Sequence, residues 1–185
     1  CKRLGITPEL LTDRNLRTPH EAQGLFWSVM EEVSQDSNIG LHLGEHMPVY
    51  KGQVLQYLFL SSPTFGDGLA RVLNYQRLLS DASQASVEVQ DGLACIVVDS
   101  ASELLGSLRH LNECMVLGLI GFFRYVTDGA FRPSAIDFSH AAPSNVGEHE
   151  RIYGCPVHFS EPETRIHFDI QLLDLPSLHA EPELL

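Results

Sequence analysis

The chain has 185 residues, of which 44% are hydrophobic and 19% charged, and its formal net charge is -12. A chain of this length is expected to fold as one domain whose core needs neither a disulfide nor a metal. Its 24 acidic side chains outnumber its 12 basic ones, which disfavours direct binding to phosphate backbones or to anionic membranes.

No segment has the character of a membrane span. The most apolar window, 115–126, contains Arg124 and is too short to cross a bilayer. The opening residues show no basic-then-apolar signal pattern. The four cysteines are scattered and form no C-x-x-C pair, so we expect free thiols and a cytoplasmic protein.

The first third of the chain is expected to be helical. Thr7 before Pro8 predicts a short helix over 8–13. Thr18 and Glu21 form a capping pair that predicts a second helix ending near Ser34. Its expected buried stripe leaves Trp27 outside and consists of Ala22, Leu25, Phe26, Val29, Met30 and Val33. Three glycines, Gly40, Gly44 and Gly52, are then expected to break the chain into a turn.

Two more helices are expected further along the chain. Thr64 and Asp67 predict an N-terminus for a helix over 64–80. The longest helix is expected over about 102–127, and its second half is apolar on nearly every side. That half should therefore be surrounded by protein.

The strongest strand signal is Asp91-Gly92, a dipeptide typical of two-residue hairpin turns. It joins strands over 85–90 and 93–99, and a two-residue loop pairs Val89 with Ala94 and Val87 with Ile96. A single strand is expected over 135–139.

A second hairpin is expected between strands over 157–160 and 165–172. In the register that pairs Ser160 with Arg165, His158 lies opposite His167. The fold class is therefore α+β, with an antiparallel sheet of two hairpins plus a further strand, packed against several α-helices.

No motif for catalysis or for a cofactor is present. The sequence lacks a nucleophile elbow, a P-loop and a dinucleotide fingerprint, so we predict a protein that is not an enzyme and that binds no cofactor and no metal. The pairs His42/His46 and His158/His167 are the closest approach to metal-ligand spacing, and both are better explained as surface histidines.

Glu113 is the most informative polar residue, because it interrupts the apolar long helix. A carboxylate in such a place must be paired, hydrogen-bonded or neutralised. Its partner would be an arginine: Arg71, Arg77 or Arg109. Alternatively, Glu113 lines a cavity and meets a polar or cationic ligand. Tyr75 on the preceding helix is open to the same two interpretations.

Several strings run in the same order as in a known family. They are Gly40-Leu41-His42-Leu43-Gly44, Ser62-Pro63-Thr64-Phe65-Gly66-Asp67-Gly68-Leu69, Asn74-Tyr75-Gln76-Arg77-Leu78, Glu113 with Phe123-Arg124, 133–140, Tyr153-Gly154-Cys155-Pro156-Val157-His158-Phe159 and Leu173-Asp174-Leu175-Pro176. In this order the chain resembles the N-terminal arabinose-binding-like effector and dimerisation domain of AraC-family bacterial transcriptional regulators.

The resemblance implies a sensing and dimerisation domain over 1–176. Residues 177–185 would begin a linker to a C-terminal helix-turn-helix domain, absent here, through which promoter DNA is bound. The arabinose regulator's own sensor is a β-barrel, and the helical content of this chain departs from that pattern.

The preferred function is therefore a homodimeric sensor whose partner is a small organic effector, with an amine or amino acid as one possibility. The expected ligand-binding residues are Tyr75, Glu113 and His140. Two alternatives stay open: an oligomerisation module without a ligand, and a small hydrolase or metal enzyme.

Overall fold

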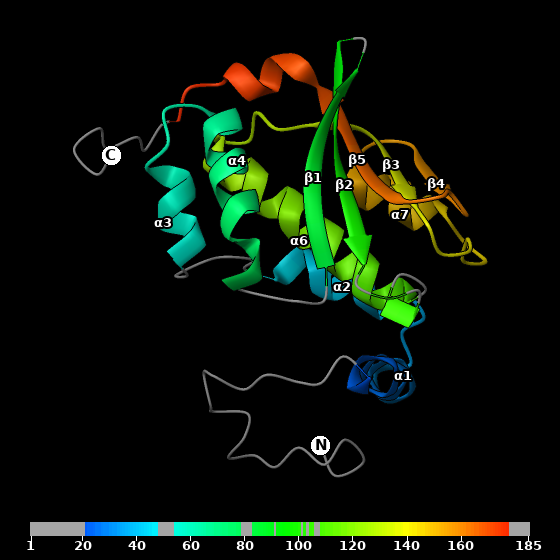
Figure 1. Cartoon of the computed structure of the whole chain (residues 1–185). Helices are drawn as coiled ribbons and strands as arrows, with labels where there is room; N and C mark the ends of the chain where they lie inside the picture. The colour runs from blue at the N-terminus through cyan, green and yellow to red at the C-terminus, as the bar shows by residue number, and fades with distance from the viewer. Residues whose placement is uncertain are drawn as a thin grey trace.

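The computed structural model describes residues 21–47, 54–78, 83–90, 92–100, 102, 104–105 and 108–177, which form a five-stranded sheet with helices packed against it (Figure 1). The helices in this part of the chain are α1 (Ala22–Ser34), α2 (Ile39–His46), α3 (Val54–Leu60), α4 (Phe65–Tyr75), α6 (Arg109–Val126) and α7 (Gly147–Tyr153), with 3-10 turns η3 (Gln76–Leu78) and η4 (Ile170–Asp174). The strands are β1 (Ser83–Gln90), β2 (Leu93–Ser100), β3 (Pro133–Phe138), β4 (Val157–Phe159) and β5 (Thr164–Asp169).

The first predicted hairpin is confirmed in its register. β1 and β2 are antiparallel and pair Val89 with Ala94 and Val87 with Ile96. Gly92 in the turn has a φ of 82°, a left-handed conformation that glycine adopts without steric cost. Ile96 is fully buried on the face that this register turns toward the core.

The second predicted hairpin is wrong, although the α+β class is confirmed. The strand order is β1-β2-β5-β3-β4, so β5 lies between β2 and β3. β4 runs parallel to β3 and pairs His158 with Asp137, while His167 lies opposite Cys95 and Ala135. Alternating hydrophobicity specifies which face of a strand is buried but not which strand lies beside it. A parallel pair needs a crossover connection, and α7 provides it here.

The main core lies between the sheet and α6, which runs behind the sheet in the view of Figure 1. The apolar second half of the predicted long helix is confirmed as buried, with Ile120, Phe123 and Val126 all at most 3% exposed. The helix begins at Arg109, later than predicted. α4 confirms the predicted cap, because the backbone N–H of Asp67 donates to the Thr64 hydroxyl at 3.1 Å.

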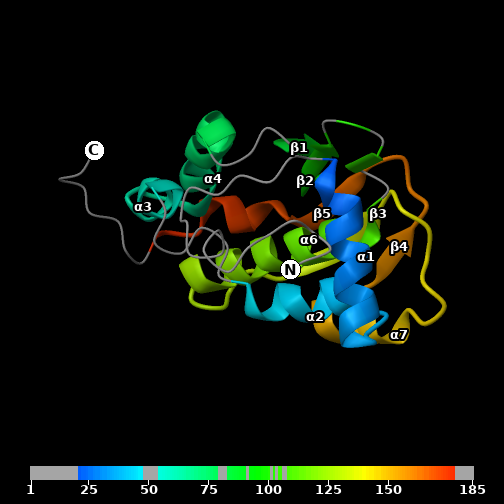
Figure 2. The same cartoon turned by 90° about the horizontal axis from the view of Figure 1, so that it is seen from below.

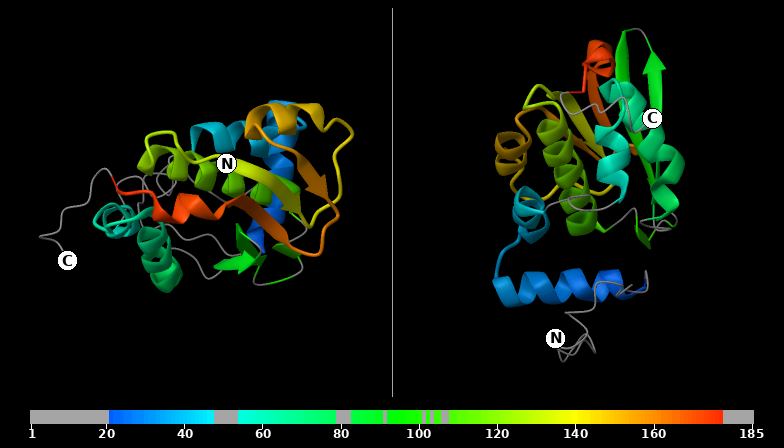
Figure 3. Two further views of the ribbon diagram at one scale, coloured as in Figure 1. Left: turned by 90° about the horizontal axis from the view of Figure 1, so that it is seen from above. Right: turned by 90° about the vertical axis from the view of Figure 1, so that its left-hand side faces the viewer.

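α1 lies at one end of the molecule, beside α2 (Figures 2 and 3). Its predicted end at Ser34 is confirmed, but the predicted stripe is wrong in part. Leu25 is 49% and Val33 76% exposed, whereas Trp27 is only 7% exposed. The reason is that α1 packs through a small second cluster, in which Trp27 meets Ile39 and Cys114.

The glycines predicted to break the chain lie in α2 instead. A Cβ on Gly40 would overlap the backbone of His110, and one on Gly44 would lie 3.0 Å from the carbonyl oxygen of Cys114. These glycines therefore let α2 approach α6 closely. The sequence also gave no prediction of α3 or α7, whose seven residues each are too few for a clear helical period.

The predicted helix over 8–13, the Thr18 cap, Gly52 and the linker beyond 177 lie outside the described residues. Of the helices that the structure describes, none is long and apolar enough to cross a membrane.

Candidate functional site

Three ionisable side chains from separate segments meet between α6, α7 and the sheet. Glu113 comes from α6, His149 from α7, and His140 from the segment that follows β3. The Glu113 carboxylate is fully buried, and its Oε1 lies 2.7 Å from His149 Nε2 and 4.0 Å from His140 Nε2. We call Glu113, His140 and His149 the Glu113 cluster.

Arg109 gives the Glu113 carboxylate its charge partner. Its Nε donates to Glu113 Oε1 at 2.8 Å from one turn earlier in α6. Burial raises the pKa of Glu113, but the hydrogen bonds from His149 and Arg109 outweigh it and bring the pKa below its ordinary value. Glu113 is therefore ionised at neutral pH.

His140 is buried among aromatic rings. The ring centroids of Phe138 and Phe159 lie 4.8 and 5.6 Å from its own, and its backbone is fixed by Ser160, whose N–H donates to the His140 carbonyl at 2.9 Å. Burial lowers the pKa of His140, more than the hydrogen bond with Ala141 raises it. The imidazole is therefore neutral at neutral pH.

Some polar atoms of the Glu113 cluster have no hydrogen-bond partner within the described part of the protein. They are Glu113 Oε2, His140 Nε2 and His149 Nδ1, and all three are buried. Buried polar atoms are paired in the great majority of native structures. The arrangement thus retains unused hydrogen-bonding capacity next to an ionised carboxylate.

A chain of polar side chains connects the Glu113 cluster with the protein surface. The Arg109 guanidinium donates to Asn38 Oδ1, and Asn38 Nδ2 donates to Glu148 Oε2 at 2.7 Å. Glu148 Oε1 lies 3.0 Å from His42 Nε2, and His42 Nδ1 lies 2.6 Å from Asp36 Oδ2. Because Glu148 and His149 are neighbours on α7, this row of hydrogen-bonded side chains connects α7 with both α2 and α6.

At the outer end of this row of side chains, His42 and its carboxylate partners each favour the charged form of the other. Hydrogen bonds to Asp36 and Glu148 raise the pKa of His42. The hydrogen bond with His42, followed by that with Asn38, lowers the pKa of Glu148 to about 2. His42 therefore favours its protonated form, in which it donates to both carboxylates.

Of the three residues expected at the site, the structure brings Glu113 and His140 together. Tyr75 is the last residue of α4, is 53% exposed, and is not among the hydrogen-bond and ion-pair partners of the Glu113 cluster. Of the three arginines considered as partners of Glu113, Arg109 is the one that binds it.

His149 is the residue of the cluster that sequence reasoning missed. The only sequence signal was a spacing of four residues between His149 and Tyr153, which places them on one side of a helix. In the structure both side chains are fully buried in α7. The Tyr153 hydroxyl donates to the backbone carbonyl of Glu113 at 2.9 Å. α7 thus contacts Glu113 through two side chains.

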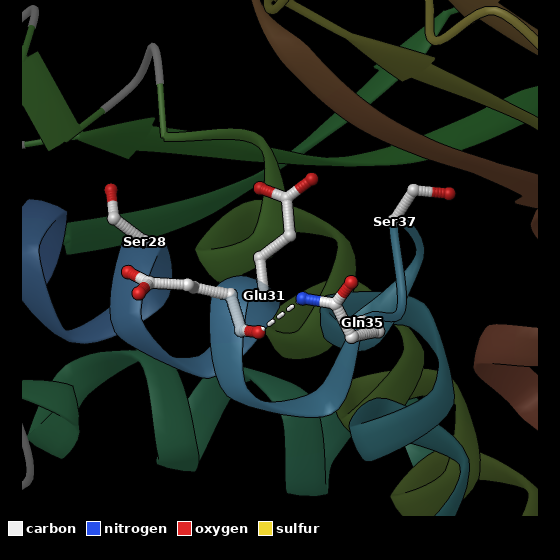
Figure 4. A pocket seen from close by; sticks show the side chains of 5 residues that line it. Ser28, Glu31, Gln35 and Ser37 are labelled. Carbon is white, nitrogen blue, oxygen red and sulfur yellow. Dashed lines mark hydrogen bonds between the residues drawn. The ribbon is translucent and has the colours of Figure 1, made fainter.

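An open depression of about 390 Å³ lies elsewhere, on α1 and the turn that follows it (Figure 4). It is lined by Ser28, Glu31, Glu32, Gln35 and Ser37, and Gln35 Nε2 donates to the Glu32 carbonyl at 2.6 Å. This surface depression is not the recess expected between the helices and the sheet.

The histidine pairs considered as metal ligands have other partners. His158 Nδ1 and His167 Nε2 lie 2.8 and 2.6 Å from the two oxygens of Asp137, and His42 is held by carboxylates. Among the described residues, no group of three or more His, Cys, Asp or Glu side chains is arranged to hold a metal ion.

Comparison with known proteins agrees with the resemblance noted in the sequence. The chain is 20% identical over 177 residues to the ornithine utilization regulator of Pseudomonas aeruginosa, covering 96% of this chain and 52% of that protein. Its fold is similar to that of the transcriptional regulator CdpR of the same organism, with a TM-score of 0.65 and 17% identity over 97% of this chain and 57% of that one.

The chain therefore spans about half the length of these relatives, both of which are named as regulators. The description "Arabinose-binding domain of AraC transcription regulator, N-term" matches residues 1–177. Because that match covers nearly the whole sequence, the chain belongs to the family of arabinose-binding N-terminal domains of AraC transcription regulators.

Proposed function

We propose that this domain senses a small organic effector and that occupancy controls DNA binding by a further, C-terminal domain. The family membership and the regulators among its relatives support a sensing role and give no support to catalysis. In this proposal, residues 1–176 form the sensing and dimerisation unit of a cytoplasmic regulator, and 177–185 begin a linker.

The observation that carries the proposed site is the buried Glu113 cluster. Burying an ionised carboxylate and two imidazoles is costly unless each polar atom finds a partner. We place the effector against Glu113 and His140. Tyr75 is proposed as a further contact only for an effector that reaches the exposed end of α4.

An amine or amino acid is the effector class that we favour. The net charge of -12 attracts cations, and a relative carries ornithine in its name. The ion pair with Arg109 already balances the charge of Glu113. The preference therefore does not rest on an unpaired carboxylate.

The binding test is a thermal-shift and calorimetric screen of the purified chain against amines, amino acids and fatty acids. A ligand at 100 times its Kd adds about 2.7 kcal/mol to the free energy of unfolding. We expect Glu113→Gln and His140→Phe to weaken binding of the hit at least tenfold. Glu150→Gln, at an exposed position of α7, is the control and should bind normally.

A hit whose affinity is the same in wild type, Glu113→Gln and His140→Phe would place the effector elsewhere. If no compound binds and the chain is a dimer by analytical ultracentrifugation, it is an oligomerisation module instead. The proposed sensor is expected to be dimeric as well, and binding is what separates the two.

A further inference from the structure

We infer that the effector presents to Glu113 and His140 a nitrogen bearing at least two hydrogens, as in a primary amine or a carboxamide. This inference rests on the proposed function and deepens it, because it specifies the chemical group that occupies the buried end of the site. It follows from the unpartnered atoms of the Glu113 cluster.

The first step is the tautomer of His140. Its Nδ1 lies 3.0 Å from the carbonyl oxygen of Ala141. A carbonyl oxygen only accepts hydrogen bonds, so Nδ1 carries the hydrogen. Since burial lowers the pKa of His140, the ring is neutral and its Nε2 has a lone pair. The unpartnered Nε2 is therefore an acceptor.

The second step concerns the carboxylate of Glu113. Both of its donors, Arg109 Nε and His149 Nε2, bind the same oxygen, Oε1, at 2.8 and 2.7 Å. The other oxygen, Oε2, is buried and has no partner in the described part of the protein. An ionised carboxylate oxygen only accepts. Oε2 is therefore a second unused acceptor.

His140 Nε2 lies 4.0 Å from Oε1 of Glu113, and the unpartnered Oε2 is the other oxygen of the same carboxylate. An acceptor buried without a donor costs the full desolvation penalty of the atom. A single ligand atom bridges both only if it carries two hydrogens. A hydroxyl carries one hydrogen, and an ether, a carboxylate or a quaternary ammonium carries none on its polar atom.

Beside Arg109, the nitrogen donor can be either neutral or charged. Because the guanidinium already compensates Glu113, a neutral carboxamide adds no net charge to the buried cluster, whereas an ammonium adds one. Both satisfy the two acceptors, so the shared chemistry is the NH₂ or NH₃⁺ group. The experiment distinguishes a carboxamide from an ammonium.

The test uses small probes and nitrogen NMR of the ¹⁵N-histidine-labelled chain. Methylammonium, acetamide and tetramethylammonium chloride are titrated to about 200 mM at constant ionic strength, because a ceiling of about 1.5 kcal/mol per non-hydrogen atom limits the two-atom methylammonium ion to a Kd of about 6 mM at best. We expect methylammonium or acetamide to shift the His140 Nε2 resonance saturably, and tetramethylammonium to leave it unchanged. Whichever of the first two acts identifies the charge.

Two variants make the result specific. His140→Phe assigns the resonance by its loss. Glu113→Gln replaces the carboxylate with an amide and should weaken the response of His140 to the active probe at least fivefold. His158 is 54% exposed in its side chain and serves as the internal control, whose resonance should respond alike to all three salts or amides.

The inference is overturned if no probe shifts His140 Nε2, the result expected when a buried water alone serves these acceptors, or if tetramethylammonium acts as well as methylammonium. Its failure is distinguishable from failure of the proposed function. An effector from the screen that lacks N–H donors, yet shifts the His140 resonance, supports the sensing site and contradicts only the inference that the effector presents a nitrogen with two hydrogens. An effector that binds without perturbing His140 removes the site itself.

Discussion

Glu113 is a fully buried carboxylate whose two donors come from different helices, Arg109 of α6 and His149 of α7. Buried ion pairs contribute little net stability, but removing one partner is expensive because the other charge stays behind in a medium of low polarity. At this position the carboxylate therefore determines how α7 sits on α6.

We expect Glu113→Ala to lower the free energy of unfolding by about 3–5 kcal/mol, since it leaves Arg109 and His149 without their acceptor. Glu113→Gln keeps one acceptor oxygen and should cost about 1–3 kcal/mol. Urea unfolding measures both. The exposed Glu150→Gln is the control, and a Glu113→Ala as stable as that control would contradict the structural role.

The sequence predicted part of this site. A carboxylate inside an apolar helix requires a partner, and Arg109 is one turn away on the same helix, so this pair was foreseeable. His140 was predicted because it belongs to the string 133–140 that resembles the family. His149 was not predicted, because its approach to Glu113 depends on the parallel pairing of β4 with β3, which no local pattern specifies.

At the scale of elements, α2 shows how a residue type can be misinterpreted. Gly40 was expected to break the chain, since glycine is a poor helix former, but the contact with α6 requires a residue without a Cβ. The first hairpin was predictable to the residue because a two-residue turn fixes its own register. The second was not, because β4 and β5 follow each other in the chain but pair with other strands: β4 pairs with β3, and β5 lies between β2 and β3.

We expect Gly40→Ala to destabilise the protein by about 2–3 kcal/mol, because the added Cβ forces α2 away from the backbone of His110. Gly121→Ala is the matched control. It lies in α6, where a Cβ meets nothing within 4 Å, and should stabilise by about 0.5–1 kcal/mol through helix propensity. Thermal unfolding of both variants provides the comparison, and equal effects would refute close packing at Gly40.

His42 should make the attachment of α7 to α2 depend on pH. Its pKa is raised by hydrogen bonds to Asp36 and Glu148, so its contribution is complete below its ordinary value of about 6.5 and is lost as the pH rises through the higher folded value. Arg151, 3.5 Å from Glu148, keeps part of the charge pairing at any of these pH values.

The measurement is the difference in unfolding free energy between wild type and His42→Asn at pH 6 and pH 9. Because these side chains are about a third exposed, we expect a difference of up to about 1 kcal/mol at pH 6 that shrinks at pH 9. The exposed His46→Asn is the control. A difference that grows with pH would show the sign to be wrong.

At the scale of the whole molecule, the described residues form two hydrophobic clusters of unequal size. The main core joins α6 to the sheet and contains Phe123 and Phe131. The second contains Trp27, Ile39 and Cys114 and holds α1. Opening free energies vary across a structure with the apolar contacts that each part buries. α1 should therefore open before the sheet does.

Trp27 is the single tryptophan and reports this opening. We expect its fluorescence transition in urea to come at a lower concentration than the loss of far-ultraviolet circular dichroism. Trp27→Ala should leave the main transition nearly unchanged, whereas Phe123→Ala, in the main core, should lower stability by about 3–5 kcal/mol. Coincident transitions of the two probes in wild type would indicate one cooperative unit.

The parallel pairing of β3 with β4 has a consequence for where the backbone tolerates cleavage. Both imidazoles near Glu113 belong to the connection between these two strands, one on each side of the exposed stretch 144–147. A protease nick or a circular permutation there would leave every strand pairing intact. It would, however, remove the covalent link between His140 and the segment that carries His149, so that the two imidazoles would be held near Glu113 only by their non-covalent contacts.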